Sequence, residues 1–379
     1  MATKEKEYEV KDHQLSISYL HVWFQLLLRN RISKDKFSMA LKITLFIVLT
    51  QPFQWLQYLL FNSKIKQTDI NKKQPLFILG HWRSGTTHLH YILSKDEQFS
   101  YLTNYQSFLL NVSLIGRTWL KVILSPLLPD KRPQDNVKLT VDSPAEEEQP
   151  FSNCSTKAGI HSFFFPQNSD YHEKYHLFKN ISPEEKREWQ QDYVYLLKKI
   201  AFVNGSRQLL LKNPHNTGRV NELLELFPQG KFVFIHRNPY EIYQSMQHHF
   251  KKVISTQFLQ DYSAEEIHER ILYVFETMLQ KYLNEKDLIP KNQLFEIAYA
   301  ELEQQPMPII QNLYQQLALP NYENAKNPIS AYLNSVKQYE RNNFKNLDKK
   351  TIQDINTRWK FAFEIWNYDM ISAEGVATI

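Results

Sequence analysis

The stretch that most constrains the fold of this chain is Pro75 to Ser94, with the sequence PLFILGHWRSGTTHLHYILS. It begins with four apolar residues, Leu76 to Leu79, a short run typical of a parallel strand that is buried on both faces. Gly80 ends the run, and a loop of small and polar residues follows. From about Thr86 onward, the apolar residues are spaced as on the inner stripe of a helix. The sequence therefore predicts a strand, a tight loop and a helix in direct succession.

The loop Gly80 to Thr87 matches the P-loop template G-x-x-x-x-G-K-[ST], except that Thr86 stands at the lysine position. In such a loop the backbone N–H groups and the positive end of the following helix form a nest for phosphate-like oxygens. Arg83 can supply the positive charge that the template takes from its lysine. The residues expected to bind an anion are Arg83, Ser84, Gly85, Thr86 and Thr87.

Two later predicted strands, 208–211 and 231–235, are followed by positive charges. Lys212 comes directly after the first, and Arg237 follows the second within HRNP. An enzyme that uses a nucleotide triphosphate normally keeps the loop lysine and holds Mg²⁺ with an acidic residue at a strand end. Ligands of open parallel sheets bind beyond the carboxyl ends of the strands. The sequence therefore predicts a cationic site without a metal at that edge.

These stretches resemble the sulfotransferases that use 3′-phosphoadenosine 5′-phosphosulfate (PAPS), in particular the broad branch with an RSGTT loop. The resemblance runs from Pro75 to the C-terminus, and five stretches carry it in the expected order: GHWRSGTTHLH, DSPAEEE, LLLKNPHNTGRV, FVFIHRNPYEIYQS and IAYAELEQQP. The chain departs from the family pattern at Asn216, where the family often has histidine. It also lacks the R-K-G triplet that the cytosolic hormone-type enzymes carry near the C-terminus.

The resemblance implies in-line transfer of a sulfuryl group from PAPS to a hydroxyl or amine, without a metal. It implies that the loop amides and Arg83 hold the 5′-phosphosulfate. Lys212 would stabilise the charge that develops on the leaving oxygen. Arg237 and Ser245, eight residues apart, would hold the 3′-phosphate.

The acidic run Asp142 to Glu148 supplies the base that the reaction needs. Pro144 and the glutamates behind it fit the first turn of a helix. The resemblance places the base at Glu146, whose pKa burial would have to raise for effective catalysis. His161 and His215 are alternative bases, because histidine titrates near neutral pH without such tuning.

The alternation of predicted strands and helices favours an α/β fold, P-loop NTPase-like, with a mainly parallel sheet flanked by helices. The chain has 379 residues, of which 42% are hydrophobic, and can bury a large core. We divide it into a helical N-terminal segment, residues 1–73, and one sulfotransferase-like α/β domain, residues 74–379. Residues 64–73 read as a polar linker into the first strand.

The N-terminal segment contains an uncharged run from Ile43 to Ser63. Pro52 interrupts this run and glutamines recur along one side of it, a pattern that disfavours a membrane span of about 20 apolar residues. The glutamines are Gln51, Gln54 and Gln57, and the flanking lysines are Lys42, Lys64 and Lys66. Burial against the core of the enzyme, peripheral contact with a membrane, and a true span are the three interpretations.

Composition limits the classes of binding partner and the cellular compartments that are compatible with this chain. A net charge of +5 is too small to indicate a nucleic-acid partner, although it suits an acidic membrane surface or a polyanionic acceptor. Cys154 is the single cysteine, which excludes an internal disulfide and a cysteine-rich zinc site. The N-terminus lacks the pattern of a cleaved secretion signal. We expect a cytoplasmic protein, with membrane association left open.

Two other functions are compatible with a P-loop. A divergent kinase would need ATP and Mg²⁺, and both Thr86 and the absence of an aspartate in FVFIHRN argue against it. A nucleotide-binding adaptor without catalysis would use residues 43–63 to reach a membrane. Lys337, Tyr339 and Arg341 form a basic and aromatic patch that could close over the adenosine. The class of the acceptor, whether saccharide, lipid or another hydroxyl compound, and the oligomeric state do not follow from the sequence.

Overall fold

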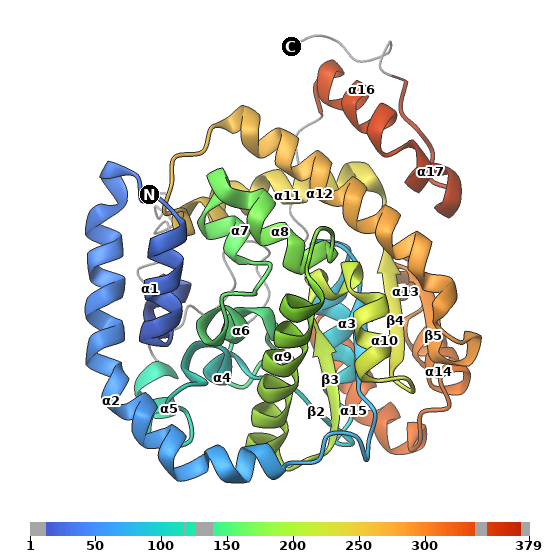
Figure 1. Cartoon of the computed structure of the whole chain (residues 1–379). Coiled ribbons are helices and arrows are strands. Elements are labelled where there is room, and N and C mark those ends of the chain that lie inside the picture. The colour runs from blue at the N-terminus through green and yellow to red at the C-terminus, as the bar shows by residue number, and fades with distance from the viewer. Residues whose placement is uncertain (1–12, 117–118, 126–138, 338–346, 373–379) are drawn as a thin grey trace, which may run out of the picture.

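The computed structural model describes residues 13–116, 119–125, 139–337 and 347–372. Within these residues one parallel sheet has five strands in the order β2-β3-β1-β4-β5, with helices on both of its faces (Figure 1). The strands are β1 (Leu76–Leu79), β2 (Phe99–Ser100), β3 (Gln208–Lys212), β4 (Lys231–His236) and β5 (Leu294–Ala298). The predicted parallel α/β architecture is confirmed, and the strand of the predicted strand-loop-helix unit is the central one.

Strand β1 and the middle residues of β3 and β4 are apolar because both faces of the sheet are covered. Phe77 and Leu79 of β1 enter one core, whereas Leu76 and Ile78 enter the other. Strand β4 alternates in the same way, with Phe232 and Phe234 on the first side and Val233 and Ile235 on the second. Side chains that alternate between two cores give the continuous hydrophobic run seen in the sequence.

The helices around the sheet begin and end at residues that are typical of helix ends. Ser182 and Ser263 form capping boxes at the starts of two long helices, and Gly205 closes the first with φ of 82°. Helices next to the sheet are α3 (Thr86–Leu93), α9 (Pro183–Asn204), α10 (Val220–Leu226), α11 (Pro239–Lys252), α12 (Ala264–Glu285), α14 (Pro306–Gln316) and α15 (Tyr322–Ser335). Of these, α15 was not predicted.

Shorter elements connect these helices and strands in the described residues. The α-helices are α4 (Asn104–Leu109), α5 (Trp119–Leu124), α6 (Glu148–Cys154), α7 (His161–Phe164), α8 (Ser169–Leu177), α13 (Tyr299–Gln304), α16 (Lys349–Arg358) and α17 (Lys360–Trp366). The 3₁₀ turns are η1 (Gln14–Ile17), η2 (Lys34–Lys36), η4 (Pro166–Asn168), η5 (Pro214–Gly218), η6 (Ile254–Gln257), η7 (Lys286–Leu288) and η8 (Lys291–Gln293).

Two helix starts differ from the prediction. The acidic run does not begin a helix at Pro144, because Pro144 bridges Thr103 and the N–H of Ala145 donates to the carbonyl of Leu102 at 2.8 Å. The helix begins at Glu148 instead. The sequence from Asn216 to Phe227 favours one helix, but the structure divides this stretch between η5 and α10, because the Asn213 side chain caps a 3₁₀ turn first.

The N-terminal segment folds as α1 (Leu20–Arg29) and α2 (Phe37–Gln67). Helix α2 is continuous for 31 residues with Pro52 inside it, so the predicted interruption was wrong. The predicted linker 64–73 begins later than expected, because the helix continues to Gln67. An internal proline costs a helix about 3 kcal/mol, which the packing of α2 against η1 and α9 can offset. Trp23 and Ile47 share a core with the sheet, and the division at residue 73 stays a prediction.

Candidate active site

The loop between β1 and α3 has a shape that only glycine permits at two positions. Gly80 has φ of 141° and Gly85 has φ of 104°, both in the region that side chains avoid. A Cβ atom on Gly85 would lie 2.2 Å from the ring of Tyr299, and one on Gly80 would lie 2.5 Å from the carbonyl oxygen of Ile235. The two glycines therefore let the loop lie directly against the ends of β4 and β5.

The predicted site residues gather at one edge of the sheet. The loop Gly80 to Thr87 leaves the central strand, Lys212 ends β3 on one side of it, and Arg237 follows β4 on the other side. All three strands are parallel, so their carboxyl ends lie together. Topology thus brings three positive side chains, from positions 83, 212 and 237, to the edge where open α/β sheets bind ligands.

Lys212, Thr87 and Glu146 form the first cluster of polar groups. The Lys212 ammonium donates to the Glu146 carboxylate and to Thr87 Oγ1, the latter at 3.3 Å. The Lys212 side chain is 3% exposed and that of Glu146 is 22% exposed. A buried ammonium needs such a partner. The Glu146 carboxylate is that partner, and it stands beside the loop at the carboxyl end of β3.

Arg83, Arg237 and Ser245 form the second cluster, from the loop, the turn after β4 and helix α11. Arg83 Nε donates to Ser245 Oγ at 2.8 Å, and an Arg237 guanidinium nitrogen donates to the backbone oxygen of Arg83 at 3.2 Å. Arg237 also pairs with Glu241 at 2.5 Å and lies over the Tyr299 ring at 4.7 Å. The Arg83 side chain thus joins the group expected at the 3′-phosphate, whereas the resemblance had assigned it to the 5′-phosphosulfate.

Ser84 lies inside the loop. Its hydroxyl and its N–H both donate to the carbonyl of His81, at 2.8 and 3.1 Å, and the side chain is buried. Ser84 therefore stabilises the turn. Its amide N–H points into the loop, whereas the prediction was that this N–H binds the anion. Gly85 is the N-cap of α3, and Thr86 and Thr87 form its first turn. The N–H groups of a first helical turn have no partner within the helix, so they are the donors this loop offers to an anion.

The two glutamates after Glu146 are committed to internal partners. Glu148 accepts two hydrogen bonds from Arg219, at 2.7 and 2.8 Å, and one from Asn213 at 2.6 Å. Burial alone would raise the pKa of Glu148, but the charge of Arg219 holds that pKa well below its usual range. The sequence offered no reason to select Glu148, Arg219 or Asn213. A glutamate that forms a buried ion pair cannot be told from a glutamate of an exposed acidic run by sequence alone.

Glu147 is buried beside neutral partners. Its Oε1 accepts from Asn216 Nδ2 at 2.9 Å and from the Tyr193 hydroxyl at 3.1 Å. Burial raises the pKa of Glu147 to about 7. Asn216, where the family often has histidine, is therefore a partner of this carboxyl group. The raised pKa expected of the base is therefore found on Glu147, whose side chain is buried. Of the three glutamates, only Glu146 has a side chain that is partly exposed to solvent.

The raised pKa of Glu147 predicts a pH-dependent gain in stability for Glu147→Gln. The folded protein holds a proton up to about pH 7, whereas the unfolded chain releases it near 4.5, so this stabilising contribution is lost as pH rises through 7. Glutamine cannot ionise, and we expect the variant to gain about 3 kcal/mol on wild type between pH 5 and pH 8. Urea unfolding at both pH values measures this. An equal difference at both would contradict a raised pKa.

The two histidines proposed as alternative bases are buried, and burial lowers the pKa of each to about 4. The His215 ring packs edge-on against Trp82 at 4.7 Å, and His161 bonds the carbonyl of Ser152 at 3.0 Å. Both are therefore neutral at physiological pH and weak as bases. Of the basic and aromatic patch, Lys337 is exposed, and Tyr339 and Arg341 lie outside the described residues.

Comparison with known proteins finds relatives that align with this chain over most of its length. The chain is 26% identical over 355 residues to the omega-hydroxy-beta-dihydromenaquinone-9 sulfotransferase Stf3 of Mycobacterium bovis and to that of Mycobacterium tuberculosis. The alignment covers 93% of this chain and 90% of each relative.

Solved structures show the same P-loop NTPase-like fold, as predicted. Sulfotransferase STF9 from Mycobacterium avium superposes with a TM-score of 0.67 at 16% identity, over 93% of this chain and 98% of that one. Sulfotransferase STF1 from Mycobacterium tuberculosis gives a TM-score of 0.59 at 15% identity, over 83% and 85% of the two chains.

The sequence model of the sulfotransferase family matches residues 75–324, more than half of the chain. The matched region begins at the first residue of the strand-loop-helix unit and contains both clusters, including Glu146, Lys212 and Arg237. The resemblance read from the five ordered stretches is confirmed, and with it the enzyme class. The chain belongs to the sulfotransferase family.

Proposed function

We propose that this enzyme transfers the sulfuryl group of PAPS to a hydroxyl or amine of its acceptor. The observation that carries the proposal is the pair of cationic clusters on either side of one anion-binding loop. PAPS has two separate anionic groups, the 5′-phosphosulfate and the 3′-phosphate. A nucleotide with one phosphate group would occupy only one cluster.

The first cluster suits the reacting end of the donor. The first-turn amides of α3, around Thr86 and Thr87, would bind the phosphosulfate oxygens, and Lys212 would contact the oxygen that leaves. The acceptor oxygen bonds to sulfur as the bond from sulfur to the 5′-phosphate oxygen breaks. The acceptor proton passes to Glu146 and the negative charge to the leaving phosphate, so that charge and atoms balance.

The ion pair between Lys212 and Glu146 suggests how donor binding prepares the base. The phosphosulfate competes with the Glu146 carboxylate for the Lys212 ammonium. Once Lys212 turns to the donor, the Glu146 carboxylate is released from the ion pair and can accept the acceptor proton. The 22% exposed side chain is the one of the three glutamates that an acceptor can approach.

The second cluster suits the other end of the donor. We assign Arg83, Arg237 and Ser245 to the 3′-phosphate, because their side chains already converge around α11. A bidentate guanidinium contact with phosphate is among the stronger hydrogen bonds in proteins. For the acceptor we propose an apolar hydroxyl compound such as a lipid. The relative Stf3 is named for a dihydromenaquinone acceptor.

For the location we propose the cytoplasm with peripheral attachment to a membrane. Helix α2 is long and apolar enough to cross a membrane by length and composition. Only 28% of its most apolar window is buried.

Calorimetry without Mg²⁺ tests the assignment of the two clusters. We expect 3′-phosphoadenosine 5′-phosphate to bind far more tightly than AMP or ATP. Arg237→Ala should weaken that binding roughly tenfold to a hundredfold, because a charge-assisted contact is worth about 1.5–3 kcal/mol. Arg207→Ala is the matched control, since Arg207 precedes β3 at the opposite edge of the sheet.

Three outcomes would argue against the proposal. Equal affinity for AMP and for the bisphosphate would rule out a second phosphate cluster. ATP binding that depends on Mg²⁺ would favour a kinase. Tight donor binding without transfer of ³⁵S from labelled PAPS to any component of a cell lysate would favour an adaptor.

A further inference from the structure

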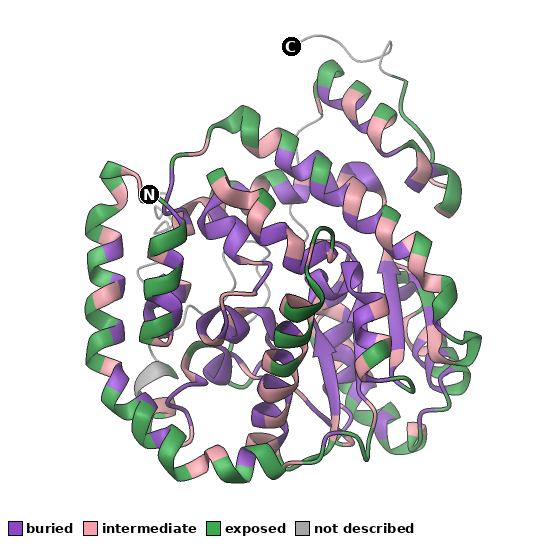
Figure 2. Cartoon of the chain, viewed as in Figure 1, coloured by how far each residue is buried: buried purple, intermediate pink, exposed green. Residues whose placement is uncertain are grey.

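Helix α2 buries three glutamines against the protein while most of its large apolar side chains face solvent. The buried residues on it include three glutamines besides apolar side chains: Ala40, Ile43, Ile47, Gln51, Gln54, Gln57 and Ile65. A surface helix of a soluble protein has the opposite arrangement. Figure 2 shows exposed positions along the whole length of α2.

Hydrogen bonds hold this orientation. Gln51 accepts from the N–H of Leu20 at 3.0 Å, and Gln54 donates to the carbonyl of Ser18 at 3.3 Å. Gln57 donates to the carbonyl of Leu110 at 2.9 Å and accepts from the N–H of Leu114 at 2.7 Å. A rotation of α2 that buried its apolar face would leave these groups unpaired, at a cost for each. The exposure of the apolar face is therefore built into the fold.

Helix α1, which contacts α2, also exposes apolar residues. The exposed apolar residues are Phe37, Leu41, Leu45, Phe46, Val48, Leu49, Phe53, Trp55, Leu56, Tyr58, Leu59 and Leu60 on α2, with Leu20, Phe24 and Leu28 on α1. The largest exposures among them are those of Leu59 at 79%, and Leu28 and Leu41 at 71%. Soluble monomers rarely expose contiguous apolar patches of more than a few hundred Å², and larger ones mark an interface. We call these residues the α1–α2 face.

Positive charge surrounds the α1–α2 face. Residues 13–68 contain seven lysines and arginines and a single acidic residue, Asp35. The seven are Arg29, Arg31, Lys34, Lys36, Lys42, Lys64 and Lys66. The formal charge of the whole protein is only +5, so its positive excess is concentrated in this segment. An apolar face with basic residues around it complements an anionic lipid surface.

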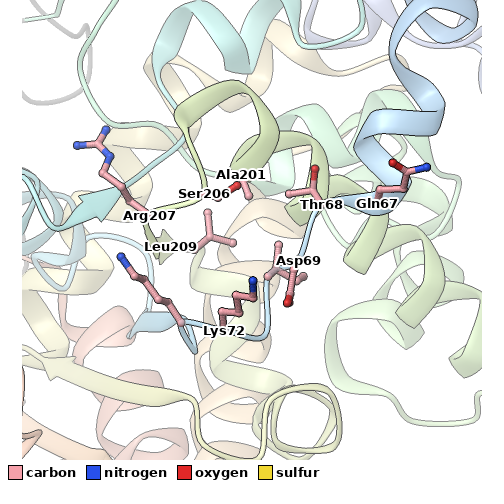
Figure 3. Close-up of a pocket in the computed structure, with 10 residues that line it drawn as sticks. Gln67, Thr68, Asp69, Lys72, Ala201, Ser206, Arg207 and Leu209 are labelled. Atoms are coloured by element: carbon pink, nitrogen blue, oxygen red, sulfur yellow. The ribbon is translucent and has the colours of Figure 1, made fainter.

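The basic rim continues where α2 ends. A hollow of about 410 Å³ lies there, lined by Gln67 and Thr68 from the helix end and by Lys72, Lys73 and Arg207 (Figure 3). Asp69 also lines it. The hollow lies at the amino ends of β1 and β3, away from the candidate active site, so its positive charges are not needed for the donor.

We propose that the α1–α2 face binds the surface of a bilayer that contains anionic lipids, with α2 lying in the plane of the interface. Trp55 and Tyr58 would sit at the headgroup level, where aromatic residues with a polar group are favoured. A spanning position is not compatible with the inner face, because Gln54, Gln57 and the bond from Lys198 to the carbonyl of Lys66 would enter hydrocarbon. This proposal does not depend on the identity of the donor.

Flotation with lipid vesicles tests the proposal on the full chain. We expect the protein to float with vesicles of phosphatidylcholine and phosphatidylglycerol, and less with phosphatidylcholine alone. The double variant Leu49→Glu and Leu59→Glu should lower the bound fraction at least tenfold. Leu288→Glu, at a 55% exposed leucine in η7, is the matched control and should float like the wild type.

Three further measurements decide between occupants of the face. The urea unfolding midpoint should be equal in all variants, which separates loss of lipid binding from misfolding. In a second measurement, light scattering gives the oligomeric state. If the wild type does not bind vesicles and is a dimer, and the double variant Leu49→Glu and Leu59→Glu is a monomer, a second copy of the chain covers the face. Retention in membranes after alkaline carbonate extraction would mean that α2 spans the bilayer. Either result overturns the proposal.

Discussion

Glu146→Gln is expected to lower turnover by roughly a hundredfold to ten-thousandfold, the usual share of a general base, while donor affinity is unchanged. Glutamine keeps the size of the side chain and still accepts a hydrogen bond from Lys212, but it cannot take up a proton. The measurement is transfer of ³⁵S from labelled PAPS to acceptors extracted from cells, together with calorimetry of 3′-phosphoadenosine 5′-phosphate. The pH profile adds a second readout, because a carboxylate base gives an acidic limb that the glutamine variant should lack.

Glu147→Gln is the matched control, since it makes the same chemical change one residue away on an enclosed side chain. It should retain turnover. His215→Asn should likewise do little, because a neutral, buried imidazole with a pKa of about 4 is a poor base at neutral pH. Loss of turnover in His215→Asn with full activity in Glu146→Gln would move the base to the segment after β3. Full activity in both would leave His161 or a strongly activated acceptor.

Arg219→Leu is expected to destabilise the protein by about 3–5 kcal/mol, because it leaves the Glu148 carboxylate buried without its partner. Both side chains of this pair are 0% exposed. Arg219 also donates to the carbonyl of Tyr175 at 2.9 Å and lies over the Trp189 ring at 5.1 Å. Glu148 accepts a hydrogen bond from Asn213. Asn213 follows Lys212, and Glu148 lies two residues after Glu146, so the Arg219–Glu148 ion pair holds both chain segments that carry the first cluster.

Urea unfolding monitored by tryptophan fluorescence measures this loss. Lys350→Leu, in an ion pair whose side chains are 72% and 79% exposed, is the matched control and should leave the midpoint unchanged. The double variant Glu148→Leu and Arg219→Leu should recover much of the loss, since it removes both buried charges. A midpoint for Arg219→Leu that matched the control would mean that water reaches Glu148 and solvates it.

The sequence was sufficient for those features that depend on neighbouring residues. The strand at Leu76, the glycine-shaped loop after it and the caps at Ser182 and Ser263 all follow from local patterns. The parallel sheet then placed positions 83, 212 and 237 at one edge, as the strand order requires. Local patterns failed where a distant partner decided the conformation. Pro144 begins no helix because Thr103 pairs with it.

Contacts between distant side chains could not be predicted. Arg83 and Ser245 are 162 residues apart, and nothing in the loop indicated that the arginine would turn toward α11. The glutamines of α2 show the same limit. Their spacing marked one polar side of a helix, and a polar side normally faces water. Only the backbone groups near residues 18 and 110, supplied by other segments, made burial favourable.

The buried glutamines also determine how this enzyme can be shortened. Cutting a chain before its catalytic domain is a common way to free an enzyme from lipid. Here a cut near residue 74 would strip the partners from Leu110, Leu114 and Asn153, whose carbonyl accepts from the Tyr19 N–H at 2.9 Å. Asn153 belongs to α6, the helix that begins two residues after Glu146. If the α1–α2 face binds lipid as proposed, a form released from the membrane is better sought by exchanging outward leucines of α2 for polar residues, with the helix left in place.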